Sequence, residues 1–264
     1  MTKNRFTLFQ LPIDPLTLNE VLEQIKLYLS APPKFRQIVS VNPENCVIAQ
    51  SNSSFRALYQ SADLALTDGI GIVLAARFAG FSSLQRVPGS VLLPRLLDLA
   101  GQMSLRVVLI GSQAKLADNI AQCYSRSYPE ATFIGTKGYV NSLQPTSEEE
   151  QALEAIVRAT RPHFVFVAFG SPTQELWINA HKVLLEGSIC MGVGGAFDYL
   201  SGATNKPPSF ISSVGLEWLY RLVMQPWRIR RQASRLPVFV GMVLKQLFGG
   251  YNASLNEKTN PHRT

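Results

Sequence analysis

A carboxylate stands at a position where it could take part in chemistry. Asp68 follows the short apolar run 63–67 and precedes Gly69 and the apolar stretch 70–78. Near the start of a helix the helix dipole favours the charged form of a carboxylate, so Asp68 could act as a general base. Asp is also a frequent helix N-cap, and this structural interpretation stands beside the catalytic one.

Two other polar segments follow apolar runs in the same way. Asn42, between Ser40 and Pro43, could hydrogen-bond a sugar or ribose hydroxyl, but Asn before Pro is also typical of a helix start. The segment Gly170 to Glu175 reads as a strand-to-helix turn, whose free amides suit a phosphate. Gln174 could contact a polar ligand group, and turn formation alone is the alternative.

The glycines and the potential metal ligands argue against a dinucleotide-binding site and against a metal site. Gly192, Gly194 and Gly195 resemble part of a dinucleotide fingerprint, but Phe197 stands at the third glycine position, so close-packed turns are favoured. A nicotinamide-dependent oxidoreductase remains an alternative. The sequence contains no Asp-x-Asp, and its three histidines are far apart, so we expect no metal and no other cofactor.

Six short apolar runs alternate with helical patterns and predict the elements that position these residues. The runs cover residues 37–41, 63–67, 106–110, 131–134, 164–169 and 188–191. Thr17 and Glu20 form a capping box ahead of one of the amphipathic helices. The alternation predicts an α/β fold with a Rossmann-like, largely parallel sheet flanked by helices. Because ligands bind at the carboxyl ends of such strands, the polar segments above should share one edge.

The charge of the chain is concentrated at one end. Residues 1–202 carry sixteen basic and sixteen acidic side chains, and residues 203–264 carry nine basic and two acidic ones, which accounts for the whole net charge of +7. We therefore divide the chain into a catalytic body (1–202), a basic, amphipathic helical appendage (203–250) and a disordered tail (251–264). A basic end should meet an anionic partner.

The appendage mixes arginines with aromatic residues. Arg221, Arg228 and Arg231 would share one face of a continuous helix, although Pro226 interrupts the stretch. Interleaved tryptophans and tyrosine suit an anionic membrane surface, and a solvated helix face is the alternative. A neutral body with few lysines argues against nucleic acid as the anionic partner. A non-enzymatic membrane-binding module therefore also remains open.

The cysteines and the N-terminus indicate a reducing compartment. Cys46, Cys123 and Cys190 are widely spaced in apolar stretches, and we expect all three to be buried free thiols. The first fourteen residues lack the long apolar run of a signal peptide, and no stretch is long enough to span a bilayer. A cytoplasmic protein that can lie on a membrane is expected.

Six segments, taken in this order, resemble the WecG/TagA/CpsF glycosyltransferase family. The similarity runs from about residue 5 to about residue 245, and six motifs in register make coincidence improbable. The matching segments are Ser40–Glu44, Asp68–Gly71, Arg86–Ser90, Gly170–Glu175, Gly192–Asp198, and Gly215–Arg221 with Pro226, Arg228 and Arg231.

The resemblance implies an inverting, metal-independent transferase at the inner face of the plasma membrane. It would move N-acetylmannosamine, its uronic acid or a related hexose from a UDP-sugar to an undecaprenyl-diphosphate-linked acceptor in cell-surface polysaccharide or teichoic acid synthesis. It implies that Asp68 is the catalytic base and that Arg221, Arg228 and Arg231 meet the membrane or a diphosphate. The substrate-binding residues that it implies are Ser40, Asn42, Arg86, Gly170, Gln174 and Asp198.

Three departures from the family pattern bear on specificity. Val91 stands where the family commonly has Asp, which removes a polar group near the pocket. Lys206 replaces an arginine, which keeps the charge but loses bidentate geometry, and Gln225 replaces a glutamate. The sequence leaves open which sugar is moved and whether the chain forms a homo-oligomer.

Overall fold

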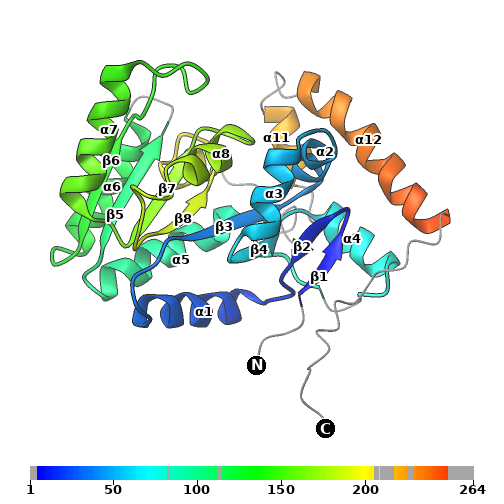
Figure 1. Cartoon of the computed structure of the whole chain (residues 1–264), viewed down its shortest axis with the longest axis horizontal. Coiled ribbons are helices and arrows are strands. Elements are labelled where there is room, and N and C mark those ends of the chain that lie inside the picture. Colours follow the sequence, from blue (N-terminus) through cyan, green and yellow to red (C-terminus); the bar gives the residue numbers. More distant parts are fainter. Residues whose placement is uncertain are drawn as a thin grey trace, which may run out of the picture.

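The fold is built around one parallel sheet (Figure 1). The computed structural model describes residues 5–81, 84–111, 115–204, 208, 217–224 and 229–248. The sheet has the order β4-β3-β8-β7-β5-β6, and all neighbouring strands are parallel. Its strands are β3 (Arg36–Val41), β4 (Leu64–Thr67), β5 (Arg106–Gly111), β6 (Thr132–Thr136), β7 (Phe164–Ala168) and β8 (Ile189–Gly192). The predicted α/β class and all six predicted strands are confirmed.

Helices cover both faces of the sheet, which explains why β4, β7 and β8 are buried at every position. One face packs against α1 (Leu18–Ser30), α5 (Gly89–Gln102), α6 (Leu116–Ser127) and α9 (Ala196–Leu200). The other packs against α2 (Pro43–Ser51), α3 (Ser53–Ser61), α4 (Ile70–Phe78), α7 (Ser147–Thr160) and α8 (Thr173–Ala180). Two further helices are α11 (Glu217–Met224) and α12 (Ile229–Phe248).

The strand order creates a switch point at the centre of the sheet. β3 and β8 are neighbours, yet β3 leads into α2 on one face and β8 leads into α9 on the other. The two connections therefore diverge at the carboxyl ends of these strands. Such a divergence opens a crevice in which α/β proteins bind ligands.

Two of the predicted helix starts, at Thr17 and at Asn42, are confirmed. Thr17 and Glu20 form the capping box of α1, with side-chain and backbone groups bonded in both directions. Asn42 caps α2 by accepting a hydrogen bond from the Asn45 amide at 2.9 Å, and Pro43 occupies the first turn. The cap interpretation of Asn42 is therefore correct.

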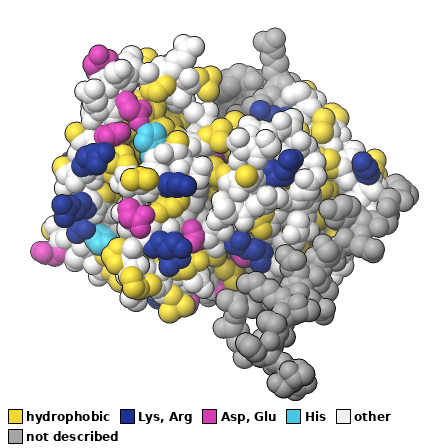
Figure 2. All heavy atoms as spheres, viewed as in Figure 1, with side chains coloured by type: hydrophobic (Ala, Val, Ile, Leu, Met, Phe, Trp, Pro, Cys, Tyr) yellow, Lys and Arg dark blue, Asp and Glu magenta, His cyan; other side chains and the backbone are white. Residues whose placement is uncertain are grey.

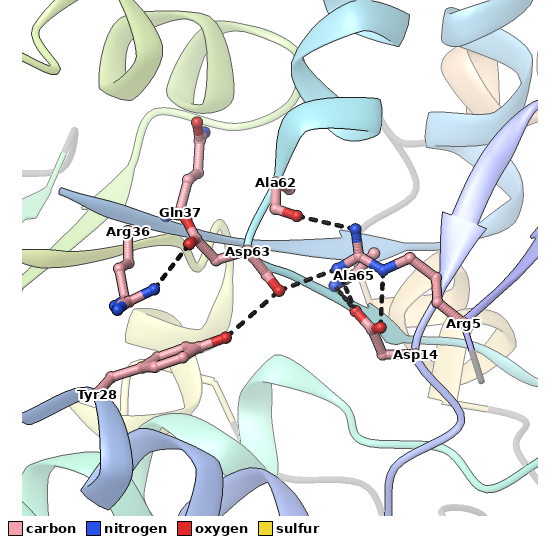
Figure 3. A network of polar contacts seen from close by, with 8 residues as sticks. All are labelled: Arg5, Asp14, Tyr28, Arg36, Gln37, Ala62, Asp63 and Ala65. Carbon is pink, nitrogen blue, oxygen red and sulfur yellow. Dashed lines mark hydrogen bonds and ion pairs between the residues drawn. The ribbon is translucent and has the colours of Figure 1, made fainter. Parts of the chain in front are cut away.

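A short N-terminal hairpin escaped the sequence analysis. It consists of β1 (Phe6–Leu8) and β2 (Leu11–Ile13), three residues each. Figure 3 shows how it is fastened: Arg5 donates to both carboxylate oxygens of Asp14, at 2.8 and 2.7 Å, and to the carbonyls of Ala62 and Asp63. Asp14 in turn accepts the Ala65 amide at 2.7 Å. The hairpin is thereby tied to the start of β4.

The same network extends to β3 and α1 (Figure 3). The Asp63 carboxylate accepts from Arg36 at 3.1 Å and from the Gln37 amide at 2.9 Å. The guanidinium of Arg36 lies 4.0 Å from the centre of the Tyr28 ring, a cation–π contact. These contacts join α1 and the hairpin to the amino-terminal ends of β3 and β4. Ligands are expected at the opposite, carboxyl-terminal ends of the strands.

The prediction that all three thiols are buried is wrong for one of them. Cys46 and Cys190 are buried, whereas Cys123 is exposed, and all three are free. Cys123 lies on α6, whose buried residues are Ala117, Ile120 and Ala121. The apolar residues near Cys123 in the sequence thus form the buried face of α6, and Cys123 lies outside that face.

The helix α12 packs against α2 (Figure 1). Phe239 is only 5% exposed and belongs to the same apolar core as α2, α3 and α4, with its ring edge-to-face on Phe9 at 5.5 Å. Arg235 forms an ion pair with Glu44 on α2. Among the described residues, no helix combines the length and apolar character needed to cross a membrane. The domain boundary at residue 202 stays a prediction, and the predicted tail lies outside the described residues.

The body shows no single charged stripe on the face drawn in Figure 2. Basic and acidic side chains are interspersed over the part of that face that is described. This agrees with a body whose charges sum to zero.

Candidate active site

A cavity of about 720 Å³ lies at the carboxyl edge of the sheet. It includes every body residue for which a site role was predicted, brought together from five separate segments of the chain. These residues are Ser40, Asn42, Asp68, Arg86, Gly170, Gln174 and Asp198. The geometry thus assembles them in one place, and their individual roles stay predictions.

Asp68 lies at the end of β4 and is half-buried in the wall of the cavity. Its backbone amide donates to the Val41 carbonyl at 2.8 Å, which fixes it beside the end of β3. The N-cap of α4 is Gly69, which makes no side-chain cap bond. The N-cap interpretation of Asp68 is therefore wrong, because the chain needs one more residue, a glycine at φ +96°, before the helix begins.

Arg86 is held next to Asp68 through the backbone. The Val87 amide donates to the Thr67 carbonyl at 2.8 Å, so the segment before α5 runs alongside the end of β4. Ser90 also lines the cavity. Val91 is 43% exposed and is not part of the cavity lining, and an influence of this position on specificity stays a prediction.

The end of β3 is supported by two buried polar residues that the sequence analysis missed. The Ser40 carbonyl accepts from the Asn45 amide group at 2.9 Å and from the Tyr59 hydroxyl at 3.0 Å. Asn45 also donates to Tyr59 at 2.7 Å. Burial raises the pKa of Tyr59, so the phenol stays protonated and can donate. Tyr59 lies on α3, and nothing in the sequence pointed to its role, because its partner Ser40 is nineteen residues away.

The turn Gly170–Glu175 does not leave its first amide free for a phosphate. The Gln174 side-chain oxygen accepts the Gly170 amide at 3.0 Å and also the Gly194 amide at 3.0 Å. Gln174 is only 5% exposed. Of the amides that this turn was expected to offer to a phosphate, that of Gly170 is occupied by the Gln174 side chain.

Gly192, the last residue of β8, is explained by close packing. A Cβ at this position would lie 2.6 Å from the Gln174 side-chain nitrogen, closer than Cβ contacts in real structures. Phe197, at the third fingerprint position, is 2% exposed and packs in the core below the cavity. The prediction of a packed turn rather than a dinucleotide fingerprint is confirmed for Gly192.

The cavity changes character toward α12. The strand ends supply most of its polar groups, whereas α4 and α12 supply an apolar wall. Leu74, Phe78, Leu236, Val240 and Leu244 are each 42–64% exposed. A cavity that is polar at one end and apolar at the other suits an amphiphilic ligand. The apolar residues of this wall that line the cavity are Leu74, Ala75, Phe78, Leu236, Phe239, Val240, Val243 and Leu244.

The predicted arginine face is only partly described. Arg221 belongs to α11, which ends at Met224, and Arg231 belongs to α12, which begins at Ile229. Arg228 and the side chains of Arg221 and Arg231 lie outside the described residues, as do Lys206 and Gln225. The shared face therefore stays a prediction. Arg235, which the sequence analysis did not select, is the appendage arginine that lines the cavity within the described part of the chain.

The fold and the cavity define an α/β enzyme that holds a carboxylate and an arginine beside a strand-end pocket large enough for a sugar nucleotide. A sequence model of the "Glycosyl transferase WecG/TagA/CpsF family" matches residues 6–253. The chain belongs to this family and is a glycosyltransferase, as the resemblance implied. The oxidoreductase and the non-enzymatic module are thereby excluded.

Several relatives carry the same name, N-acetylglucosaminyldiphosphoundecaprenol N-acetyl-beta-D-mannosaminyltransferase. The protein of Bacillus spizizenii is 35% identical over 209 residues, which is 79% of this chain and 78% of the relative. That of Bacillus subtilis strain 168 is 32% identical over 210 residues, 79% of each chain. That of Staphylococcus aureus strain MW2 is 28% identical over 233 residues, 88% of this chain and 89% of the relative.

Proposed function

We propose that this enzyme transfers an N-acetylmannosamine-type sugar from a UDP donor to N-acetylglucosamine linked through a diphosphate to a polyprenyl lipid. The observation that carries the proposal is the cavity, which joins polar strand ends to an apolar wall on α4 and α12. The names of the relatives specify N-acetylmannosamine as the transferred sugar and a lipid-diphosphate-linked N-acetylglucosamine as the acceptor. The product would enter a cell-surface polysaccharide or a teichoic acid.

Asp68 is proposed as the base of an inverting transfer. Inversion requires one group to take the proton of the attacking acceptor hydroxyl as that oxygen bonds to the sugar's anomeric carbon and UDP departs with the bond's electrons. Asp68 is half-buried in the cavity wall at a strand end, where a bound acceptor can reach it. Arg86 lies on the adjacent segment and can meet the negative charge that grows on the leaving diphosphate.

Metal independence belongs to the same proposal. The sequence offers no Asp-x-Asp pair to hold a divalent ion on the diphosphate. Arginine side chains would provide the positive charge instead, from Arg86 and from the appendage residues Arg221, Arg228 and Arg231. Activity that persists in excess chelator is the expected result, and strict dependence on added Mg²⁺ or Mn²⁺ would contradict it.

The test of the reaction is a donor screen with UDP-sugars against a short-chain lipid-diphosphate N-acetylglucosamine. UDP-N-acetylmannosamine should be the best donor. Asp68→Asn should lower kcat by at least about 100-fold, the lower range for loss of a general base, while UDP still binds in a calorimetric titration. Asp118→Asn, a matched change in the first turn of α6 and outside the cavity lining, should leave turnover intact. Full turnover by Asp68→Asn would remove the base assignment.

The lipid acceptor leads us to place the enzyme on the inner face of the plasma membrane. The chain's excess positive charge lies in the same C-terminal quarter as α12, on which Val238 is 48% exposed. The full chain should sediment with anionic vesicles. Val238→Glu should weaken this, whereas Val183→Glu, at an exposed body position, should not. Equal sedimentation of both variants would refute the role of α12.

A further inference from the structure

One buried amide links the two glycine loops that line the cavity. The Gln174 oxygen accepts the amide of Gly170, which follows β7, and the amide of Gly194, which follows β8, both at 3.0 Å. Both donors are backbone N–H groups, so the side-chain oxygen must face them and the NH₂ group must face the other way. The distance between the two loops is therefore set by the orientation of a single side chain.

Glu175 holds that orientation. The Gln174 NH₂ group donates to Glu175 Oε1 at 2.8 Å, and the Ser171 hydroxyl donates to the same oxygen at 2.7 Å. The backbone carbonyl of Glu175 accepts from the Gln37 side chain at 3.1 Å, which anchors the residue to β3. Without Glu175 Oε1 as an acceptor, Gln174 would lose the hydrogen bond that keeps its NH₂ group turned away from the loops and its oxygen turned toward them.

The two oxygens of Glu175 have different surroundings. Oε1 accepts two hydrogen bonds, whereas Oε2 is buried and has no hydrogen-bond partner among the residues that the structure describes. Glu175 as a whole is 2% exposed. This asymmetry is that of a carboxylic acid, with Oε1 as the carbonyl oxygen and Oε2 as the hydroxyl, because a buried carboxylate oxygen without a donor would be far more costly. Burial raises the pKa of Glu175 more than its hydrogen bonds lower it, which agrees with the geometry.

Among the residues that the structure describes, the elements packed against α8 provide no cation that pairs with Glu175, and Arg56 on α3 donates instead to the Ala49 carbonyl. Tyr59 on α3 interacts electrostatically with Glu175, and Cys46 and Asp68 act on the same phenol. Tyr59, Cys46 and Asp68 are neutral or acidic groups, so none of them stabilises a negative charge on Glu175. Of the strands that α8 contacts, β7 has no titratable residue, β8 has Cys190, and the Arg36 side chain of β3 is bound to Asp63 at the opposite edge of the sheet.

We infer that Glu175 is a positioning residue that works as a neutral acid: it fixes the Gln174 amide and, through it, the two glycine loops of the cavity. The inference rests on the proposed transfer reaction for its kinetic consequence. Its structural consequence does not depend on which sugar is transferred.

Two substitutions at this position separate the inference from a general structural role. Glu175→Gln keeps an acceptor oxygen for Ser171 and Gln174 and replaces the O–H group by N–H, so it copies the neutral acid. Glu175→Ala removes the acceptor. A misplacement of about 1 Å at a reacting group costs roughly 100-fold in rate. We expect Glu175→Ala to lower kcat by roughly that factor with little change in UDP affinity, and Glu175→Gln to restore kcat to within about threefold of the parent.

A second readout is independent of activity. A group whose pKa is raised by folding stabilises the folded state at low pH, and this stability is lost as the pH rises through the raised value. The parent protein should therefore lose thermal stability, relative to Glu175→Gln, as the pH rises above the ordinary glutamate value of 4.5. A difference of about 3 °C in Tm would be readily measured for a chain of this size.

The outcomes are distinct. A folded Glu175→Gln that is as inactive as Glu175→Ala, or a parent whose Tm follows that of Glu175→Gln at every pH, would overturn the inference, because the ionised form would then be the native one. If Glu175→Ala does not fold, the kcat and the pH dependence of Tm of Glu175→Gln, compared with those of the parent, still test whether Glu175 is a neutral acid. If the parent transfers no sugar from any donor, the proposed function fails while the stability comparison still tests Glu175.

Discussion

Replacing Phe239 with alanine is expected to release α12 from the body without unfolding the sheet. The Phe239 ring is 5% exposed and meets the edge of Phe9. It also packs over Gly71, where an added Cβ would lie only 3.2 Å from the ring. Besides this ring, Met242 and Val243 of α12 pack against the same core, and the Arg235–Glu44 ion pair joins α12 to α2. Each partner of that pair is about one quarter exposed, so its contribution is small.

The magnitude follows from the burial of the ring. A Phe→Ala change in a core costs about 3–5 kcal/mol, and the lower end applies here because a surface helix can relax into the space. A loss of about 3 kcal/mol raises the population of the undocked helix by roughly 100-fold, since 1.4 kcal/mol corresponds to a factor of ten. Transfer should fall as well, because α12 forms one wall of the cavity.

Hydrogen–deuterium exchange measures this directly. Peptides from residues 229–248 should exchange roughly 100-fold faster in Phe239→Ala, while the buried strand Phe164–Ala168 keeps the exchange rate of the parent. Val238→Ala, one residue away and 48% exposed, is the matched control and should change neither region. Equal acceleration in α12 and in the strand would refute the reasoning, because Phe239 would then hold the whole fold rather than one helix.

Two further predictions concern the fold. Asp14→Ala should lower the free energy of unfolding in urea by about 2–4 kcal/mol, because it leaves the buried Ala65 amide without an acceptor and removes the carboxylate partner of Arg5. Glu23→Ala, at an exposed ion pair, should cost less than about 0.5 kcal/mol, and equal losses would contradict this account. A disulfide reagent at pH 8 should modify one thiol per native chain, Cys123, since burial raises the pKa of the other two. Labelling of all three before denaturation would show that the core opens readily.

The strands could be predicted because each one carries its signal locally. A strand covered by helices on both faces is an unbroken apolar run, and Phe164–Ala168 is buried at all five positions. The edge that holds the site was predictable for a related reason. In a parallel sheet every strand points the same way, so the residues that follow them, such as Asp68 and Gly170, gather at one edge.

The elements that escaped prediction have weak or contradictory local signals. The strands of the hairpin, Phe6–Leu8 and Leu11–Ile13, are three residues long, too short for an alternating pattern. The helix Gly89–Gln102 contains Pro94 and begins without a side-chain cap, so its start resembled a loop. The strand order is set by packing between distant segments and has no local signature.

The α/β class, the strand-end segments and the family could be predicted from the amino-acid sequence, because these depend on the order and periodicity of residue types along the chain. The contacts of each polar group became known only from the folded structure. It showed that Gln174 binds Gly194, twenty residues away, that Asp68 is not a cap, and that Phe239 belongs to the core. The physical reason is that a hydrogen bond or a packing contact depends on which distant atoms the fold brings within reach.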